Sequence, residues 1–473
     1  MRTFEIIIAA ILFLSLMIRF LRTEKFVWLN LLPLFNLLAI AYHFFVEGLR
    51  WQMIPLYILS IWMIPFALQR IRSPQSQPKT RRTITGLVVL LICASLPILM
   101  PVPKFPKPTG LYPVGTQTFY WVDESRLEVF SEDPDLIYAN PSNHPRKVMV
   151  QVWYPAVAES GDQLAPYLPD GERDSLAISK TFELPGFFLS HLALSKTNAL
   201  QNASLATCFD QWLVLVFSHG WQGMRYQSTA QMENLASHGY IVFAPEHAYG
   251  AVISVYPDGS SIANNPEILP DGVSDDAYQQ AALVLGDSWV GDLVFTLDQI
   301  DRLQSGQIPS VFSGHIQTTK IGLFGHSTGG GAALQTCAID SRCQAVLAED
   351  PWLVPYNREL PTQGVSQPTL LIFSEAWKSQ LNLPLLKSLW EAQPAGTARM
   401  TIHGTKHFDF TDIPFYSPLA ALLGFKGPIP VKQEIPLIND FVTGFFDLNL
   451  VNPDSNLLST AVENYPGNNF EIK

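Results

Sequence analysis

The chain has little charge, little cysteine and no pattern typical of a bound metal or nucleotide. Charged residues make up 15% of its 473 residues, and cysteine occurs four times. No Cys/His spacing resembles a metal site, and no glycine-rich loop follows a first strand as a dinucleotide-binding fold needs. The formal net charge is −11, which disfavours nucleic acid and other polyanionic partners. We therefore expect no cofactor, no metal ion and no nucleic-acid partner.

Charge is scarcer in residues 1–103 than in the rest of the chain, and apolar residues form long runs there. Only Glu5 and Arg19 are charged within four stretches that are each near the length of a membrane-spanning helix: Phe4 to Leu21, Phe26 to Val46, Trp51 to Leu68 and Ile84 to Val102. A secretory signal peptide is the alternative for the first stretch, but no small-residue cleavage site follows it. We predict a transmembrane helical region of about four spans, with three spans or a re-entrant piece as the alternative.

Basic residues indicate the orientation of these spans. Two of the connecting turns are rich in them, whereas the turn between the second and third stretches carries only Arg50; the basic residues are Arg19, Arg22, Lys25, Arg70, Arg72, Lys79, Arg81 and Arg82. By the positive-inside rule both rich turns are cytoplasmic. The N-terminus and residues 104–473 should then lie on the outer or periplasmic side. Lys104 and Lys107 argue weakly against this orientation.

A strand followed by a G-x-S-x-G turn is the most informative motif of the chain. The apolar run 320–324 precedes the sequence GHSTG at 325–329, and the small residues at 330–335 suit a helix. The two glycines permit the sharp turn that lifts a serine hydroxyl clear of a sheet, and a side chain at either position would crowd that turn. The motif predicts a nucleophilic Ser327, and a glycine-rich turn with an idle serine is the alternative.

A nucleophilic serine needs a base and an orienting acid, which follow it along the chain in α/β-hydrolases. Residues 345–348 have the pattern of the next buried strand, and two carboxylates, Glu349 and Asp350, come directly after them. Asp350 is the preferred acid, and Glu349 is the alternative if the strand register differs by one residue. His407 is the preferred base because it comes after a glycine turn, whereas His403 belongs to the alternating strand pattern.

An earlier strand predicts the donors for an oxyanion. Residues 213–218 have the pattern of a buried strand, and the His-Gly turn at 219–220 matches the loop that donates a backbone N–H in such folds. We expect the oxyanion hole to consist of the N–H groups of Trp221 and Thr328. An ordinary strand-to-loop turn with a buried His219 is the alternative.

Further motifs give the chain a family resemblance. They are VQVWYP at 150–155, FSHG at 217–220, LASHGYIV at 235–242, EH at 246–247, YPDG at 256–259 and GTKH at 404–407. Over roughly residues 110–450 the chain resembles the plasma/isoform II type of platelet-activating-factor acetylhydrolase, a branch of the α/β-hydrolase lipases. The resemblance implies nucleophile Ser327, acid Asp350 rather than Glu349, and base His407, with the same oxyanion amides. It also implies calcium-independent release of short or oxidised sn-2 acyl groups from phospholipids.

The expected architecture is a transmembrane helical region over residues 1–103 followed by one catalytic domain over 104–473. The second part should have the α/β-hydrolase fold, a mostly parallel central sheet with helices on both faces. The proline-rich link 101–108 should be extended and hold the domain a short distance from the membrane. Segment 183–194 has a Pro-Gly break and then an apolar helical pattern, which would either cap the acyl pocket and touch the bilayer or pack in the core.

The cysteines allow one disulfide. Cys93 lies inside a predicted span, whereas Cys337 and Cys343 flank a turn after the helix expected behind Ser327. In an outward compartment these two could pair, with Cys208 as the other candidate partner. Three buried reduced thiols outside the span are the alternative.

Together these patterns predict a membrane-anchored serine ester hydrolase that acts on phospholipid or another ester through an acyl-enzyme. A general carboxylesterase or polyester-type hydrolase is an alternative, because fold and triad do not determine the substrate. A non-catalytic membrane sensor that binds lipid is a second alternative. A transporter role is the weakest, because the spans contain few charges.

Overall fold

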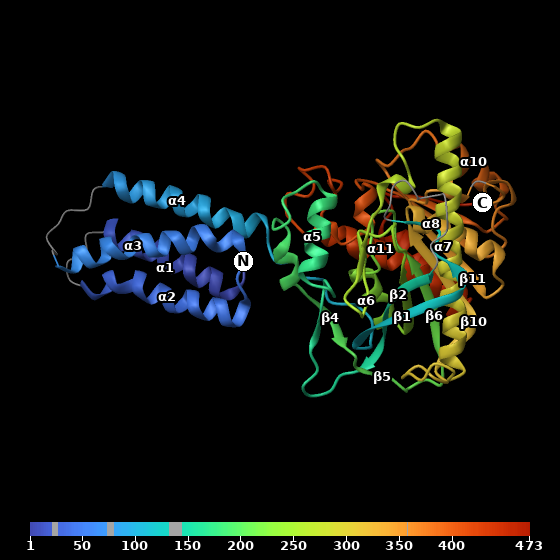
Figure 1. Ribbon diagram of the computed structural model, residues 1–473, viewed down its shortest axis with the longest axis horizontal. Helices are drawn as coiled ribbons and strands as arrows, with labels where there is room; N and C mark the ends of the chain where they lie inside the picture. Colours follow the sequence, from blue (N-terminus) through green and yellow to red (C-terminus); the bar gives the residue numbers. More distant parts are fainter. Residues whose placement is uncertain (21–26, 73–79, 132–143, 357) are drawn as a thin grey trace.

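The computed structural model describes residues 1–20, 27–72, 80–131, 144–356 and 358–473. Helices α1 to α4 form a bundle at one end of the molecule, and the later elements form a larger α/β body at the other (Figure 1). The N-terminus lies at the end of the bundle that faces the α/β body. The bundle therefore ends close to the domain boundary expected from the sequence, since α4 ends at Leu99.

Among its described residues, the bundle contains three helical stretches that are long and apolar enough to cross a membrane. These are Leu29–Glu47, Trp51–Gln69 and Thr80–Leu99. The first expected span is a shorter apolar helix over Thr3–Ile18, so its crossing stays a prediction. The elements are α1 (Thr3–Phe20), η1 (Val27–Leu31), α2 (Leu32–Tyr42), η2 (His43–Glu47), η3 (Trp51–Met53), α3 (Ile54–Arg72) and α4 (Thr80–Leu99).

The basic residues used for orientation are described only in part. Arg22, Lys25 and Lys79 lie outside the described residues. The end of α3 at Arg72 and the start of α4 at Thr80 lie at the end of the bundle remote from the α/β body (Figure 1). The N-terminus and the α/β body therefore share one end of the bundle, as the predicted orientation requires, and the orientation itself stays a prediction.

Within the described residues the α/β body contains a 12-stranded sheet in the order β14-β13-β12-β11-β10-β6-β7-β2-β1-β4-β3, with β5 paired to β2. The six neighbours from β13 to β7 run parallel. Their near-continuous apolar sequences suit strands that are covered on both faces. The strands are β1 (Val114–Leu127), β2 (Pro145–Val157), β3 (Leu164–Pro166), β4 (Lys196–Gln201), β5 (Ser204–Leu205), β6 (Trp212–Ser218), β7 (Tyr240–Glu246), β10 (Ile316–His326), β11 (Cys343–Glu349), β12 (Thr369–Ser374), β13 (Ala398–Ile402) and β14 (Asn469–Ile472), beside a hairpin of β8 (Ile253–Val255) and β9 (Ser261–Ala263).

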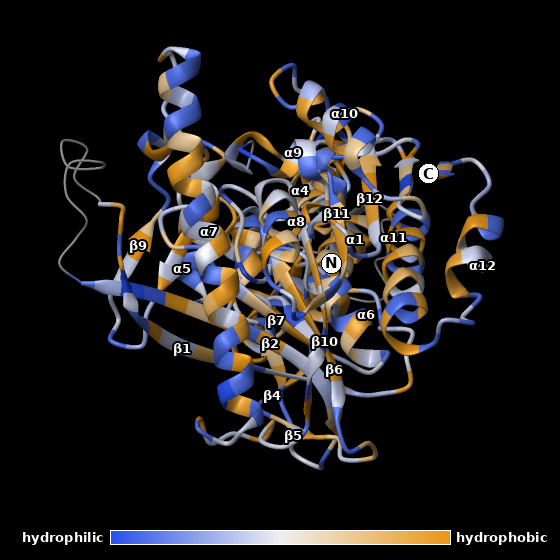
Figure 2. Cartoon of the chain, turned by 90° about the vertical axis from the view of Figure 1, so that its right-hand side faces the viewer, coloured by the Kyte–Doolittle hydropathy of each residue, from blue (hydrophilic) through white to orange (hydrophobic). Residues whose placement is uncertain are grey.

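Helices cover both faces of this sheet. Side chains of α7 and α8 belong to one buried apolar cluster, and those of α6 and α11 belong to another. Along α7, hydrophilic and hydrophobic residues alternate in bands (Figure 2), and Leu285, Trp289 and Leu293 at four-residue spacing are fully buried. The helices are α5 (Glu172–Thr181), α6 (Thr229–Ser237), α7 (Asp275–Gln304), α8 (Thr328–Ile339), α9 (Leu360–Gln363), α10 (Leu383–Ala392), α11 (Val431–Phe446) and α12 (Leu457–Asn464). The predicted mostly parallel sheet with helices on both faces is confirmed.

Two connecting segments differ from the expectation. The link after α4 is not a free spacer, because the Phe105 ring packs against Tyr167 and Phe415 and Ser195 Oγ donates a hydrogen bond of 2.8 Å to the Pro103 carbonyl. The apolar helix expected over 183–194 is a series of turns followed by the short 3₁₀ helix η4, Ser190–Leu194. The link therefore lies on the α/β body instead of standing apart from it, and segment 183–194 does not form the expected apolar helix.

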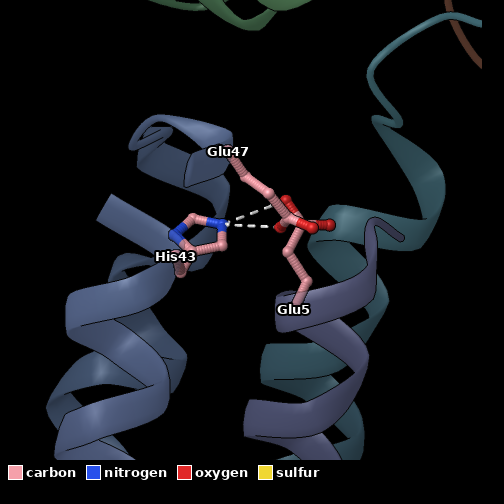
Figure 3. A group of neighbouring side chains, drawn as sticks. All are labelled: Glu5, His43 and Glu47. Carbon is pink, nitrogen blue, oxygen red and sulfur yellow. Dashed lines mark hydrogen bonds and ion pairs between the residues drawn. The ribbon is translucent and has the colours of Figure 1, made fainter. Parts of the chain in front are cut away.

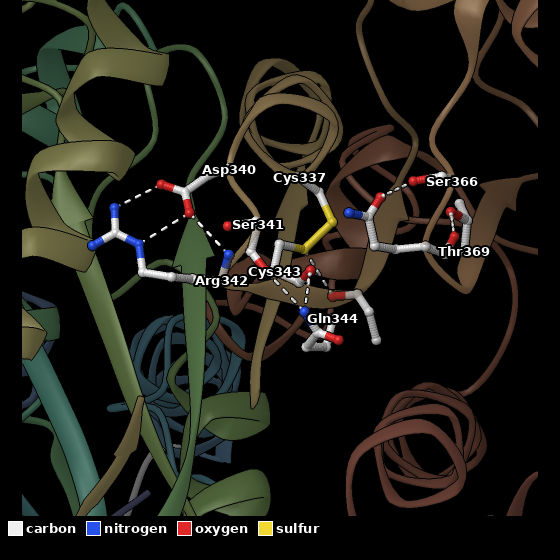
Figure 4. Close-up of a disulfide and its surroundings, with 10 residues drawn as sticks. Cys337, Asp340, Ser341, Arg342, Cys343, Gln344, Ser366 and Thr369 are labelled. Atoms are coloured by element: carbon white, nitrogen blue, oxygen red, sulfur yellow. Dashed lines mark hydrogen bonds and ion pairs between the residues drawn. A yellow bond between two sulfur atoms is a disulfide. The ribbon is translucent and has the colours of Figure 1, made fainter. Parts of the chain in front are cut away.

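One of the disulfide alternatives is confirmed. Cys337 in α8 and Cys343 at the start of β11 are bonded, and the ion pair between Arg342 and Asp340 closes the same turn at 2.6 Å (Figure 4). Cys208 is an exposed free thiol. The alternative of three buried reduced thiols is therefore wrong.

Candidate active site

The predicted turn at Ser327 is present between β10 and α8. Ser327 has φ 57° and ψ −122°, a conformation that costs free energy for a residue with a side chain. A Cβ on Gly325 would lie 2.4 Å from the Gly329 carbonyl oxygen, and one on Gly329 would lie 2.1 Å from the Ser218 carbonyl oxygen. The turn therefore requires glycine at both positions, as the motif predicts.

Asp350 and His407 meet at the same edge of the sheet. His407 Nδ1 lies 3.0 Å from Asp350 Oδ2, and the carboxylate also accepts hydrogen bonds from the backbone N–H (2.8 Å) and hydroxyl (2.6 Å) of Ser374. The Trp377 ring stacks on the His407 ring at 4.6 Å and 11°. Ser374 and Trp377 were missed by the sequence analysis, although Ser374 ends β12 at the edge where Asp350 follows β11. These two residues hold the acid and the base in position.

Glu349, the alternative acid, faces away from this pair. Its carboxyl accepts a hydrogen bond of 2.6 Å from Gln231 Nε2 of α6, because successive side chains of a strand point to opposite faces of a sheet. Burial raises the pKa of Glu349 to about 8, and the charge of Asp350 adds to the rise. His403, the alternative base, is half-exposed and lies 3.1 Å from Glu375. The structure brings Asp350 and His407 together, and it does not bring Glu349 or His403 to them.

The turn after β6 lies against the nucleophile turn. A Cβ on Gly220 would lie 3.2 Å from Ser327 Cβ, and the Gly220 carbonyl accepts hydrogen bonds from His219 Nδ1 and Gly223 N–H, both at 2.8 Å. Within the part of the chain that the structure describes, the N–H groups of Trp221 and Thr328 have no acceptor. Both amides are therefore free to donate to a ligand.

A mostly apolar cavity of about 450 Å³ opens at these residues. Ser327, His407 and Trp221 line it, whereas Asp350 lies behind His407 and is fully buried. Its rim comes from the end of α5 and from the segment after His407; the apolar lining residues are Ile178, Phe182, Met224, Val252, Phe408, Ile413, Tyr416 and Phe425. Cavities of this size and character bind small apolar groups with a few polar contacts.

A second Ser-His-Asp set lies beneath this site. Ser218 Oγ is 2.9 Å from His247 Nε2, and His247 Nδ1 is 3.0 Å from Asp292 Oδ2. Burial alone would raise the pKa of Asp292, but the guanidinium groups of Arg146 and Arg126 outweigh it and hold that pKa below its usual range. The Ser218, His247 and Asp292 side chains are completely buried. No ester can reach Ser218, so this set supports the fold beneath the site.

One group of three side chains among the described residues could supply metal ligands, namely Glu5, His43 and Glu47 at the end of the bundle near the N-terminus (Figure 3). His43 Nε2 lies 3.5 Å from Glu5 and 3.7 Å from Glu47. Arg2 and Arg50 already pair with Glu5 at 2.9 and 2.7 Å, and Arg2 is 3.0 Å from His43 Nε2. Because two guanidinium groups balance two carboxylates, a cation would have to displace an arginine. The group fits an ion-pair network better than a metal site.

Comparison with known proteins bears on this site. The family model described as platelet-activating factor acetylhydrolase, isoform II, matches residues 99–269 and 294–456. The chain belongs to this family. The match begins where α4 ends, so the helical bundle lies almost wholly outside it. The resemblance expected from the motifs is confirmed.

Individual relatives agree with the family. The chain is 23% identical over 330 residues to the platelet-activating factor acetylhydrolase of Gallus gallus. The matched region covers 64% of this chain and 78% of that protein. The chain is 28% identical over 281 residues to the platelet-activating factor acetylhydrolase of Bos taurus, a match that covers 54% of this chain and 60% of that protein. It is 25% identical over 275 residues to a probable 1-alkyl-2-acetylglycerophosphocholine esterase of Arthroderma benhamiae, a match that covers 54% of this chain and 64% of that protein.

A solved structure extends this result to the fold. A ferulic acid esterase from Streptomyces cinnamoneus matches with a TM-score of 0.62 and 25% identity, over 78% of this chain and 99% of that one. The α/β body therefore has the α/β-hydrolase fold that the motifs predict. With the family match, the protein is a carboxylic ester hydrolase.

Proposed function

We propose that the protein is a membrane-anchored serine hydrolase that releases short or oxidised sn-2 acyl groups from phospholipids. The observation that carries this proposal is the meeting of Ser327, His407 and Trp221 at one apolar cavity, with Asp350 bonded to His407. The backbone N–H groups of Trp221 and of Thr328, the residue after Ser327, have no acceptor among the described residues. The family membership supports the phospholipid class, since relatives are named as acetylhydrolases.

The mechanism is acyl transfer in two steps. His407, held and electrostatically stabilised by Asp350, takes the proton of Ser327 as Oγ attacks the ester carbonyl carbon. The oxyanion that forms accepts hydrogen bonds from the N–H groups of Trp221 and Thr328. The alcohol leaves with the proton from His407, and water then hydrolyses the acyl-serine by the same route. Each amide contributes about 3 to 4 kcal/mol to stabilising the transition state.

Membrane anchoring is supported by the surface of the bundle. Large apolar side chains face outward, among them Phe45 at 80% and Leu91 at 71% exposure. Many exposed apolar side chains on one helical bundle are unfavourable in water and favourable in lipid. The Cys337–Cys343 disulfide suits the outer or periplasmic compartment that the positive-inside rule assigns to the α/β body.

The junction between the bundle and the α/β body supports a substrate that arrives from lipid. The Trp51 indole donates a hydrogen bond of 3.0 Å to the Phe188 carbonyl and lies 5.6 and 5.5 Å from the Phe187 and Phe188 rings. Gln52 Nε2 is 2.9 Å from His191 Nδ1, and both side chains are buried. Phe187, Phe188 and His191 follow within ten residues of Phe182, which lines the cavity. The cavity rim is therefore held beside the membrane part of the chain.

The proposal is tested with the detergent-solubilised protein and its Ser327→Ala variant. Three substrates are compared without added calcium: a phospholipid with a short sn-2 chain, a long-chain phospholipid and an aryl ester. We expect rapid acid release from the short-chain lipid, lost in the variant. Similar rates on both lipids would contradict the chain-length preference, and no activity on any substrate would favour a lipid-binding sensor.

A general carboxylesterase is the second candidate. The structural similarity to a ferulic acid esterase favours it, because that relative is named for a different ester. Turnover of the aryl ester with none of either lipid would support this second candidate and refute the first.

A further inference from the structure

A chain of side-chain hydrogen bonds joins the turn at Gly220 to the base. The Gly220 N–H donates to Gln227 Oε1 at 3.2 Å. Gln227 Nε2 lies 3.3 Å from His326 Nδ1, and His326 Nε2 lies 2.9 Å from the His407 carbonyl oxygen. The chain thus starts one residue before Trp221, passes beside Ser327 and ends on the backbone of His407.

For a neutral imidazole, the partners of each atom determine the donor and acceptor roles in this chain. A carbonyl oxygen only accepts, so His326 Nε2 carries the proton and donates it to His407. In a neutral imidazole Nδ1 then accepts, so Gln227 donates to it through Nε2 and uses Oε1 for Gly220. Reversing the glutamine amide or moving the imidazole proton would set two donors or two acceptors against each other.

The surroundings favour the neutral form of His326. Gln227 and His326 are 6% and 3% exposed. The titratable groups that face His326 are His407, whose ring centre is 4.4 Å away, and His219. Burial, followed by these two rings, holds the pKa of His326 well below its usual value. At neutral pH the imidazole therefore keeps the single proton that the chain of hydrogen bonds needs.

We propose that Gln227 and His326 are positioning residues that hold the oxyanion turn and the catalytic base in one geometry. Other hydrogen bonds also join the segment after β6 to the loop after β13, from Ser228 Oγ to the Phe410 carbonyl and from the Asp412 N–H to the Gln227 carbonyl. These bonds lie farther along both segments, whereas the chain through the Gln227 and His326 side chains ends on Gly220 and His407 themselves. Misplacement by about 1 Å can lower a rate about a hundredfold. The inference rests on the proposed function, because it assigns these residues to the same reaction.

Gln227→Glu is the decisive variant, because it keeps the shape and the acceptor for Gly220 but turns the donor that faces His326 into an acceptor. His326 then takes a second proton, and its charge beside His407 disfavours protonation of the base. We expect the acidic limb of the kcat/KM profile to move to lower pH by about half a unit or more. Gln299→Glu, a buried glutamine of α7 that already accepts from Arg302 at 3.1 Å, is the matched control and should leave the limb unchanged.

Substitutions of His326 give a graded test of position. His326→Gln keeps a donor for His407 but loses the acceptor for Gln227, and His326→Phe loses both. On a soluble aryl ester we expect kcat to fall about tenfold in His326→Gln and about a hundredfold in His326→Phe. KM should change little in both variants. Equal losses in the two variants, or losses that follow the thermal unfolding midpoint, would overturn the proposal in favour of a structural role.

Histidine ¹⁵N NMR tests the chain of hydrogen bonds without any activity. We expect His326 to be neutral with its proton on Nε2 in the natural protein and doubly protonated in Gln227→Glu. Finding the proton on Nδ1 overturns the proposal even in an active enzyme. If the expected tautomer is found in a protein that hydrolyses no ester, the proposed function fails while the hydrogen-bonded chain stands, so the positioning role in ester hydrolysis is overturned.

Discussion

Two neighbouring carboxylates allow a matched test of the catalytic acid. Asp350→Asn removes the charge that faces His407 Nδ1 at 3.0 Å and keeps the side-chain shape. Glu349→Gln also replaces a carboxyl by an amide, one residue earlier, where the group faces Gln231 at 2.6 Å and keeps its proton near neutral pH because its pKa is raised to about 8. Both side chains are fully buried. The two variants therefore differ mainly in whether the base loses its partner.

The expected magnitude follows from the charge that forms on His407 during the reaction. Opposite charges about 4 Å apart attract by about 4 kcal/mol at an effective dielectric constant of about 20. Losing this attraction raises the barrier enough to slow kcat about a thousandfold. An asparagine amide must also oppose a donor of Ser374 or of His407, which adds to the loss. KM should change little, because Asp350 does not line the cavity.

The assay is steady-state hydrolysis of an aryl ester near neutral pH, with thermal unfolding of each variant as the control. We expect Asp350→Asn to lose about a thousandfold or more in kcat, and Glu349→Gln to stay within about threefold of the natural protein. The reasoning is refuted if Glu349→Gln loses more activity than Asp350→Asn, or if Asp350→Asn keeps more than about a tenth of the rate.

Three other predictions concern stability and substrate access. Since burial raises the pKa of Glu349 to about 8, the folded state retains a proton that the unfolded state releases, and stability falls as pH rises from about 4.5 to about 8. The Tm of Glu349→Gln minus the Tm of the natural protein should therefore increase between pH 5 and pH 9 in calorimetry, and a constant difference would contradict this. Removing the Cys337–Cys343 disulfide by a double alanine substitution should lower the free energy of unfolding by about 2 kcal/mol, measured by denaturant titration, with kcat unchanged. Replacing Phe187 and Phe188 by serine should slow hydrolysis of vesicle lipid far more than that of a soluble short ester, because both rings contact Trp51 at the membrane junction. Equal losses on the two substrates would rule out the membrane-contact role.

Much of the site could be predicted because its signals are local. The glycines beside Ser327 are required by contacts within one turn and the adjoining strand end, so the spacing alone is informative. The choice between Glu349 and Asp350 could not be made from spacing, because a shift of one residue along a strand reverses the face to which a side chain points. The resemblance favoured Asp350, and the position of His407 agrees with it.

Contacts between distant segments could not be read from the chain. Ser374, Trp377 and Gln227 have no motif of their own, and each acts on a residue from another strand or loop. The segment over 183–194 has an apolar pattern that suits a helix. In the structure it makes turns and a short 3₁₀ helix, and its Phe188 and His191 contact Trp51 and Gln52 of the bundle, which are distant along the chain.

The sequence by itself determined the apolar helices, the nucleophile turn and the family, since these depend on composition and on spacing within a few residues. Only the tertiary structure decided which carboxylate meets the base, which cysteines pair and how the bundle holds the cavity rim. The reason is physical. The order of β6, β10, β11, β12 and β13 in the sheet brings together side chains that are far apart along the chain, and each hydrogen bond among them depends on that arrangement.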